Sequence, residues 1–82
     1  MREEIEQLFG YAEIAEAIDD QRYVVEHVAS THGVVPIGAF RGSLVFRTDQ
    51  ARSIAKTVRS LTTDERRAIR RDTLATLQKE LS

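Results

Sequence analysis

The sequence predicts a mostly α-helical domain that carries one short β-hairpin. Along most of the 82 residues, apolar side chains recur three and four positions apart, which is the period of an amphipathic helix. The exception is the stretch GVVPIGAFRGSLVF, residues 33–46, which holds three of the four glycines and the only proline. Glycines between two short apolar runs are typical of a hairpin. The length suits a single domain over residues 1–82.

Three helical segments are predicted before the hairpin. The first lies in residues 2–9 and has three apolar residues at helical spacing, namely Ile5, Leu8 and Phe9. A helix of about two turns follows in YAEIAEAI, residues 11–18. The third segment, QRYVVEHVASTH, has apolar residues at positions 24, 25, 28 and 29. Asp20 is suited to cap this third helix at its start, and Gly33 to follow its last turn.

The hairpin is predicted to pair Val34–Ile37 with Leu44–Arg47 through the loop GAFRG. Pro36 has no N–H group, so we expect it at a strand edge. Thr48 or Asp49 is expected to cap the next helix. The apolar stripe of that helix consists of Ala51, Ile54, Ala55, Val58 and Leu61. We expect Ile54 to be buried against Val28 of the third helix.

A final helix is predicted over residues 63–81. The run from Thr62 to Glu65 fits the capping box, in which a threonine and a glutamate three positions later satisfy helical N–H groups. The helix carries three leucines at three-four spacing: Leu74, Leu77 and Leu81. This seam can pack on the first helix of the same chain or pair with a second copy as a weak homodimer. The cluster RRAIRR, residues 66–71, can be a solvated helix start or a DNA backbone contact. The dipole at a helix N-terminus disfavours cations, which slightly favours a partner for its arginines.

The formal net charge of −1 conceals a strong asymmetry. Residues 1–38 contain two basic and eight acidic residues, whereas residues 39–82 contain ten basic and five acidic ones. A chain divided in this way can present a basic side to a polyanion. Two amphipathic segments that happen to differ in sign would give the same count.

Several other classes of protein are not expected. The chain has no cysteine, and no run approaches the roughly 20 apolar residues of a membrane span, so we expect a cytoplasmic protein. His27 and His32 are five positions apart and do not share a helix face. No phosphate-binding glycine loop or nucleophile motif is present. We therefore expect no enzyme, no metal or other cofactor, and no small-molecule ligand.

The order of the elements suggests a DNA-binding architecture. A short helix, a tight turn and a second helix form a helix-turn-helix, and a hairpin directly after it forms a wing. The predicted fold is therefore a winged helix-turn-helix, with its core at about residues 11–60, flanked by N- and C-terminal helices.

From about Tyr11 to Val58 the sequence resembles the MerR-type winged helix-turn-helix group, which includes phage excisionases. The motifs that carry the resemblance are YAEIAEAI, then GVVPIG, then VFRTDQARSI. Asp19-Asp20 stand where that group commonly has a glycine-containing turn. The resemblance implies a small protein that binds double-stranded DNA, as a transcription regulator or an excisionase-like factor. It places the second helix of the motif in the major groove and the wing on the backbone or in the minor groove.

The candidate DNA-binding residues lie on three elements: Gln21, Arg22, Tyr23 and His27 on the recognition helix, Arg41 on the wing, and Arg47, Arg52 and Lys56 after it. Glutamine and arginine can pair with adenine and guanine edges. Arginine also suits phosphates and narrow minor grooves, whereas basic residues on the later helix would position the protein without reading sequence. Each of these residues also fits an ordinary solvated surface. The main alternative is a protein–protein interaction module on the same scaffold, which the slightly acidic balance favours. A weaker alternative is an accessory subunit of DNA packaging or recombination.

Overall fold

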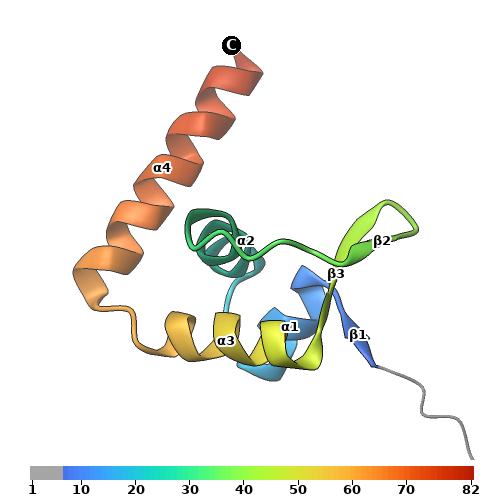
Figure 1. The fold of residues 1–82 in the computed structure, drawn as a ribbon. Helices are drawn as coiled ribbons and strands as arrows, with labels where there is room; N and C mark the ends of the chain where they lie inside the picture. Colours follow the sequence, from blue (N-terminus) through green and yellow to red (C-terminus); the bar gives the residue numbers. More distant parts are fainter. Residues whose placement is uncertain (1–6) are drawn as a thin grey trace, which may run out of the picture.

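The computed structural model describes residues 7–82, so Ile5 and most of the helix predicted for residues 2–9 lie outside the described part. The chain forms four helices and a small three-stranded antiparallel sheet (Figure 1). The elements in order are β1 (Leu8–Phe9), α1 (Tyr11–Ala17), α2 (Arg22–Thr31), β2 (Gly38–Phe40), β3 (Ser43–Arg47), α3 (Thr48–Arg59) and α4 (Thr63–Leu81). The predicted mostly helical domain with a hairpin after the second helix of a helix-turn-helix is thereby confirmed.

A single apolar core joins α1, α2, β3, α3 and α4. Val28 of α2 and Ile54 of α3 are both buried in it, as the helical periodicity predicted. Phe46 of β3 is completely buried, and its ring lies 5.4 Å from that of Tyr11, centroid to centroid. The full set of buried residues is Ile14, Ala15, Val24, Val25, Val28, Ala29, Phe46, Ile54, Val58 and Ile69.

The turn between α1 and α2 is built by the two aspartates. Asp19 has a φ of 55°, a left-handed conformation that glycine usually takes after a helix and that aspartate tolerates better than most residues. The Asp19 and Asp20 N–H groups donate to the carbonyls of Glu16 and Ala15, at 3.2 and 2.9 Å, which closes the end of α1. Asp19 thus takes the place that the turn would give to a glycine.

Asp20 is not the N-cap of α2, contrary to the prediction. Gln21 occupies that position and makes no side-chain cap. The Asp20 carboxylate accepts the Gln21 N–H at 2.7 Å and two hydrogen bonds from the Arg66 guanidinium, at 3.1 and 2.7 Å. A charged, two-pronged partner binds a carboxylate more strongly than the neutral N–H groups of a helix start, so the tertiary contact determines the role of Asp20.

The first strand of the hairpin is shifted along the chain from its predicted place, whereas the second strand matches the predicted Leu44–Arg47 to within one residue. Strand β2 begins at Gly38, and Val34–Ile37 form an extended connection rather than a strand. Pro36 cannot donate a ladder hydrogen bond, and pairing starts directly after it, where the Ile37 N–H donates to the Val45 carbonyl at 3.0 Å. Phe40 lies opposite Ser43, so the turn contains only Arg41 and Gly42.

The helix predicted for the N-terminal residues is wrong at Leu8 and Phe9, which form strand β1. Leu8 lies opposite Arg47, and Phe9 lies opposite Phe46, so β1 covers the free edge of β3. The unpaired backbone groups of β3 are satisfied in this way, and Phe9 packs against the core. Two adjacent apolar residues suit either a helix or a strand, and the available sheet edge selects the strand here.

Helix α3 follows β3 without a loop, and Arg47 is its N-cap in place of the predicted Thr48 or Asp49. The Gln50 side chain performs the capping, since its Oε1 accepts from the Arg47 N–H at 3.0 Å. Its amide also donates to the Val35 carbonyl at 2.6 Å, which ties the connection before the wing to α3. The wing is therefore anchored at both of its ends.

Helix α4 has the predicted bounds and the predicted capping box. The Thr62 N–H donates to Glu65 Oε1 at 2.8 Å, and the Glu65 N–H donates to Thr62 Oγ1 at 3.1 Å. The helix packs its first half on α2, and its C-terminal half extends away from the rest of the protein (Figure 1). The predicted packing of its leucine seam on Leu8 and Phe9 is wrong, because those residues lie in the sheet. None of the helices within residues 7–82 is long and apolar enough to cross a membrane.

Candidate nucleic-acid interface

Helix α2 lies between α4 on one side and the β2–β3 hairpin on the other (Figure 1). Its apolar face packs on α1 and α3, so the face opposite the core is open between α4 and the wing. Arg22 and Ser30 of this face are exposed, and Tyr23, Glu26 and His27 are half-buried. A helix flanked in this way presents a convex polar ridge, which is the shape that enters a major groove.

Two candidate arginines come together in a groove between α2 and the wing. Arg22 from the start of α2 and Arg41 from the hairpin turn both line it, together with Tyr11 and Phe40. These residues come from α1, α2 and the wing, so the fold joins positions that are far apart in the sequence. Glu13 lines the same groove, and its Oε1 accepts a hydrogen bond from the Gly10 N–H at 2.6 Å. Two guanidinium groups on one groove can bind a phosphate group.

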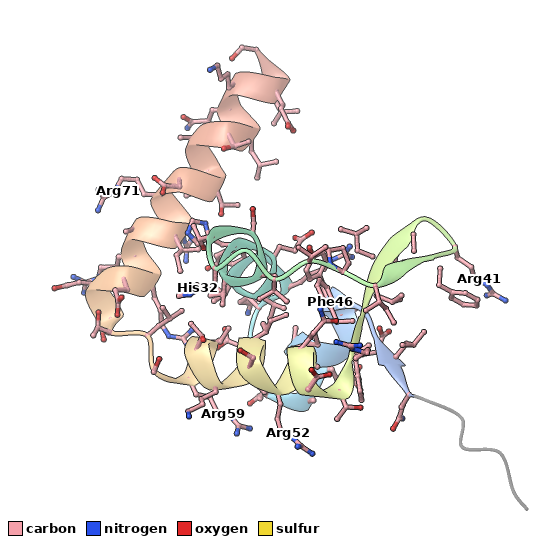
Figure 2. All side chains as sticks on the ribbon, in the orientation of Figure 1. His32, Arg41, Phe46, Arg52, Arg59 and Arg71 are labelled. Atoms are coloured by element: carbon pink, nitrogen blue, oxygen red, sulfur yellow. The ribbon has the colours of Figure 1, made fainter. Side chains whose placement is uncertain are left out.

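Arg41 occupies a strained position at the wing tip (Figure 2). Its φ is 53° and that of Gly42 is 81°, the pattern of a two-residue hairpin turn that favours asparagine and glycine. A left-handed backbone costs a residue such as arginine roughly 1–2 kcal/mol. The guanidinium lies 5.3 Å from the centroid of the Phe40 ring, and no carboxylate within residues 7–82 pairs with it.

Arg22 and Glu26 form a weak ion pair one helical turn apart on α2. The Arg22 Nε and Glu26 Oε1 atoms are 3.9 Å apart, and both side chains are about half exposed. Their charges act on Tyr11, whose pKa is raised mainly by burial and further by Glu26, while Arg22 lowers it. A pair this long and this exposed contributes little to stability, so both groups are available to a ligand.

The other candidates on α2 face α4 rather than the wing. Gln21 and Tyr23 line a shallow groove whose far wall is formed by Arg70, Leu74 and Leu77 of α4. His27 lines a separate groove further along, with a carboxylate on each side: Glu65 and Asp72. Arg70 is a cation beside α2 that sequence reasoning did not select individually. The only signal for it was the RRAIRR cluster.

The three basic residues after the wing do not join Arg22 and Arg41. Arg47 pairs with Asp49, with 3.4 Å between Nε and Oδ1. Arg52 points away from α2 (Figure 2), and Lys56 lies one turn further along the same side of α3. None of the three lines the groove formed by Arg22 and Arg41.

The partner expected for the RRAIRR cluster is found for its first arginine. The Arg66 guanidinium makes two hydrogen bonds to Asp20, and its Nη2 group also donates to the Val58 carbonyl at 3.1 Å. The hydrogen bonds from Arg66 hold the pKa of the Asp20 carboxyl below its usual value. This contact ties α4 to the helix-turn-helix and to the end of α3. The Asp20 carboxylate is therefore paired within the protein.

The described residues contain no group of three or more histidine, cysteine or carboxylate side chains arranged to hold a metal ion. Comparison with protein-family models, curated proteins and solved structures finds no significant match to this chain. The functional argument therefore rests on the geometry of α2 and the wing.

Proposed function

We propose that this is a small cytoplasmic protein that binds double-stranded DNA and acts as a transcription regulator or an excisionase-like factor. Helix α2 enters the major groove, and the wing contacts the backbone or the adjacent minor groove. The observation that carries this proposal is Arg41, an exposed arginine held in a left-handed turn across a groove from Arg22. The resemblance to MerR-type domains agrees with the same docking.

The proposed footprint is smaller than the set of residues chosen from the sequence. Arg22 and Arg41 form its wing side, and Gln21, Tyr23 and Arg70 its α4 side. Arg52 and Lys56 lie outside it. With few phosphate contacts the affinity for DNA should be modest and strongly dependent on salt, since each neutralised phosphate releases counterions.

A titration of mixed-sequence duplex DNA at two salt concentrations tests the proposal. Binding that weakens at higher salt, with a log–log slope corresponding to a few phosphate contacts, supports a DNA-binding function. Absence of binding at low salt would favour the alternative of a protein-interaction module. The observation behind that alternative is the exposure of Val35 and Phe40 near the wing, at 73% and 63%.

Replacing Arg41 with asparagine should weaken DNA binding about tenfold while leaving the hairpin as stable as before or more so. The guanidinium is lost, but asparagine is favoured at this left-handed turn position. Affinity is measured by fluorescence anisotropy and stability by thermal unfolding. Arg59→Gln is the matched control, because Arg59 is also an exposed arginine and points away from α2 (Figure 2). Equal losses of affinity in both variants would show that only total charge matters.

We further propose that two copies associate weakly through the C-terminal half of α4. Leu74, Leu77 and Leu81 are 48%, 46% and 84% exposed and lie along one side of this helix. One winged helix reads only a few base pairs, so pairing on DNA would raise the affinity. We expect Leu81→Glu to remove concentration-dependent association in sedimentation velocity, because Leu81 is the most exposed of the three and does not line the groove beside Gln21 and Tyr23. Gln78→Glu should leave the association intact. A wild-type protein that stays monomeric at all concentrations, with or without DNA, would exclude this interface.

A further inference from the structure

Helix α2 carries a carboxylate on the face proposed to meet DNA. Glu26 is the only acidic residue of α2, and its side chain is 45% exposed. The position lies one turn after Arg22, with which its carboxylate is paired on the polar face of the helix. A carboxylate is repelled by phosphates, so its presence on such a face needs an explanation other than backbone attraction.

The bases of DNA offer one group that suits a carboxylate in the major groove. Cytosine presents its N4 amino group there as a donor, and glutamate or aspartate can accept from it. Guanine presents the N7 and O6 acceptors, to which arginine donates in a bidentate manner. The Arg22–Glu26 pair therefore has the donor and acceptor groups complementary to a G·C-containing step.

The spacing of the two residues agrees with this pairing. Four residues of α-helix advance about 6 Å, and successive base pairs are about 3.4 Å apart, so the two residues are separated by at most about two base-pair steps along the groove. The 3.9 Å separation of the two charged groups leaves each of them able to turn toward a base. Tyr11 beside them is half-buried and narrows the groove on the side of α1.

We propose that Arg22 and Glu26 act together as the sequence-reading pair of α2, with Arg22 on guanine and Glu26 on cytosine. This inference rests on the proposed function and adds to it the class of site that the protein prefers. In this arrangement Glu26 lowers the affinity for DNA in general and raises the discrimination between sequences.

The test is selection from a randomised duplex pool by the full-length protein, followed by sequencing of the bound DNA. The wild type should select a site that contains a G·C step. Glu26→Gln should change the preferred base at one position from cytosine to adenine, because glutamine pairs with the N6 and N7 groups of adenine. Glu26→Ala should lose discrimination at that position by about tenfold, the size of one good base contact, and bind unrelated DNA more tightly.

Glu16→Gln is the matched control, since it removes one exposed carboxylate from α1 and should leave the selected site unchanged. Circular dichroism of each variant establishes that it is folded. Identical base preferences in the wild type and Glu26→Gln would contradict the proposed base contacts of Arg22 and Glu26 while leaving a DNA-binding function intact. Failure of the wild type to bind any duplex would instead overturn the proposed function, and this inference with it.

Discussion

Replacing Phe46 with alanine is expected to lower the free energy of unfolding by about 3–5 kcal/mol, the range for large buried aromatic residues. The Phe46 side chain is completely buried and is among the largest in the core. It packs in the cluster with α2 and α3 residues and contacts the Tyr11 ring. Its strand also pairs with both β1 and β2. A domain of this size has a total stability on the order of 5–10 kcal/mol, so the variant should be close to unfolding at room temperature.

Urea unfolding followed by circular dichroism measures this effect. Phe40→Ala is the matched control, since the same change of side chain is made on the wing at a residue that is 63% exposed. We expect this variant to lose less than about 1 kcal/mol. Similar losses at the two positions would mean that Phe46 does not lie in the core described above.

Replacing Asp20 with alanine should destabilise the protein by about 2 kcal/mol, the size of a lost hydrogen bond between charged groups in a half-buried site. The Asp20 and Arg66 side chains are 13% and 37% exposed, so solvent screens this pair only in part. Removing the carboxylate leaves the guanidinium with the Val58 carbonyl alone. Hydrogen exchange should show earlier opening of α4, because Arg66 is its main polar tie to the helix-turn-helix.

The same carboxylate predicts how stability depends on pH. The pKa of Asp20 is lowered in the folded protein, chiefly by the hydrogen bonds from Arg66. Its contribution is therefore complete above the unfolded pKa of about 4 and is lost as the pH falls through the lower folded value. The difference in melting temperature between the wild type and Asp20→Asn should shrink from pH 7 to pH 2.

Asp64→Asn is the control for this series, because Asp64 and Arg67 form a 4.0 Å pair on an exposed surface. Pairs of this kind contribute about 0–1 kcal/mol. If Asp64→Asn destabilised the protein as much as Asp20→Ala does, neutralising any carboxylate on this protein would have the same effect. A difference between the wild type and Asp20→Asn that does not change with pH would assign the loss to something other than the ion pair.

Local chemistry was sufficient to predict the helices. Val28 and Ile54 repeat with the helical period, and helix α4 starts at a threonine–glutamate capping box that needs only neighbouring residues. The wing was predicted from its glycines, and its second strand was predicted to within one residue, but its first strand was misplaced. The pairing starts directly after Pro36, and Arg41 with Gly42 forms the turn.

The candidate site was predicted by residue type and not by location. The sequence identifies arginines after a helix-turn-helix, but it does not state which of them share a face with α2. Arg41 and Arg22 meet at one groove, whereas Arg52 points away, because α3 lies beneath the apolar face of α2. Arg70 lies beside the start of α2 because Ile69, its neighbour in the sequence, is buried in the core.

The sequence by itself determined the order of the elements from α1 onward, the helix periods and the composition of the wing, because each depends on residues a few positions apart. The tertiary structure alone decided the fate of Leu8–Phe9, which form a strand because the edge of β3 offers unpaired backbone groups. It also decided that Asp20 binds Arg66 across 46 positions rather than capping α2. In both cases a strong partner distant in the chain outweighs a weak local preference, and local patterns contain no information about such a partner.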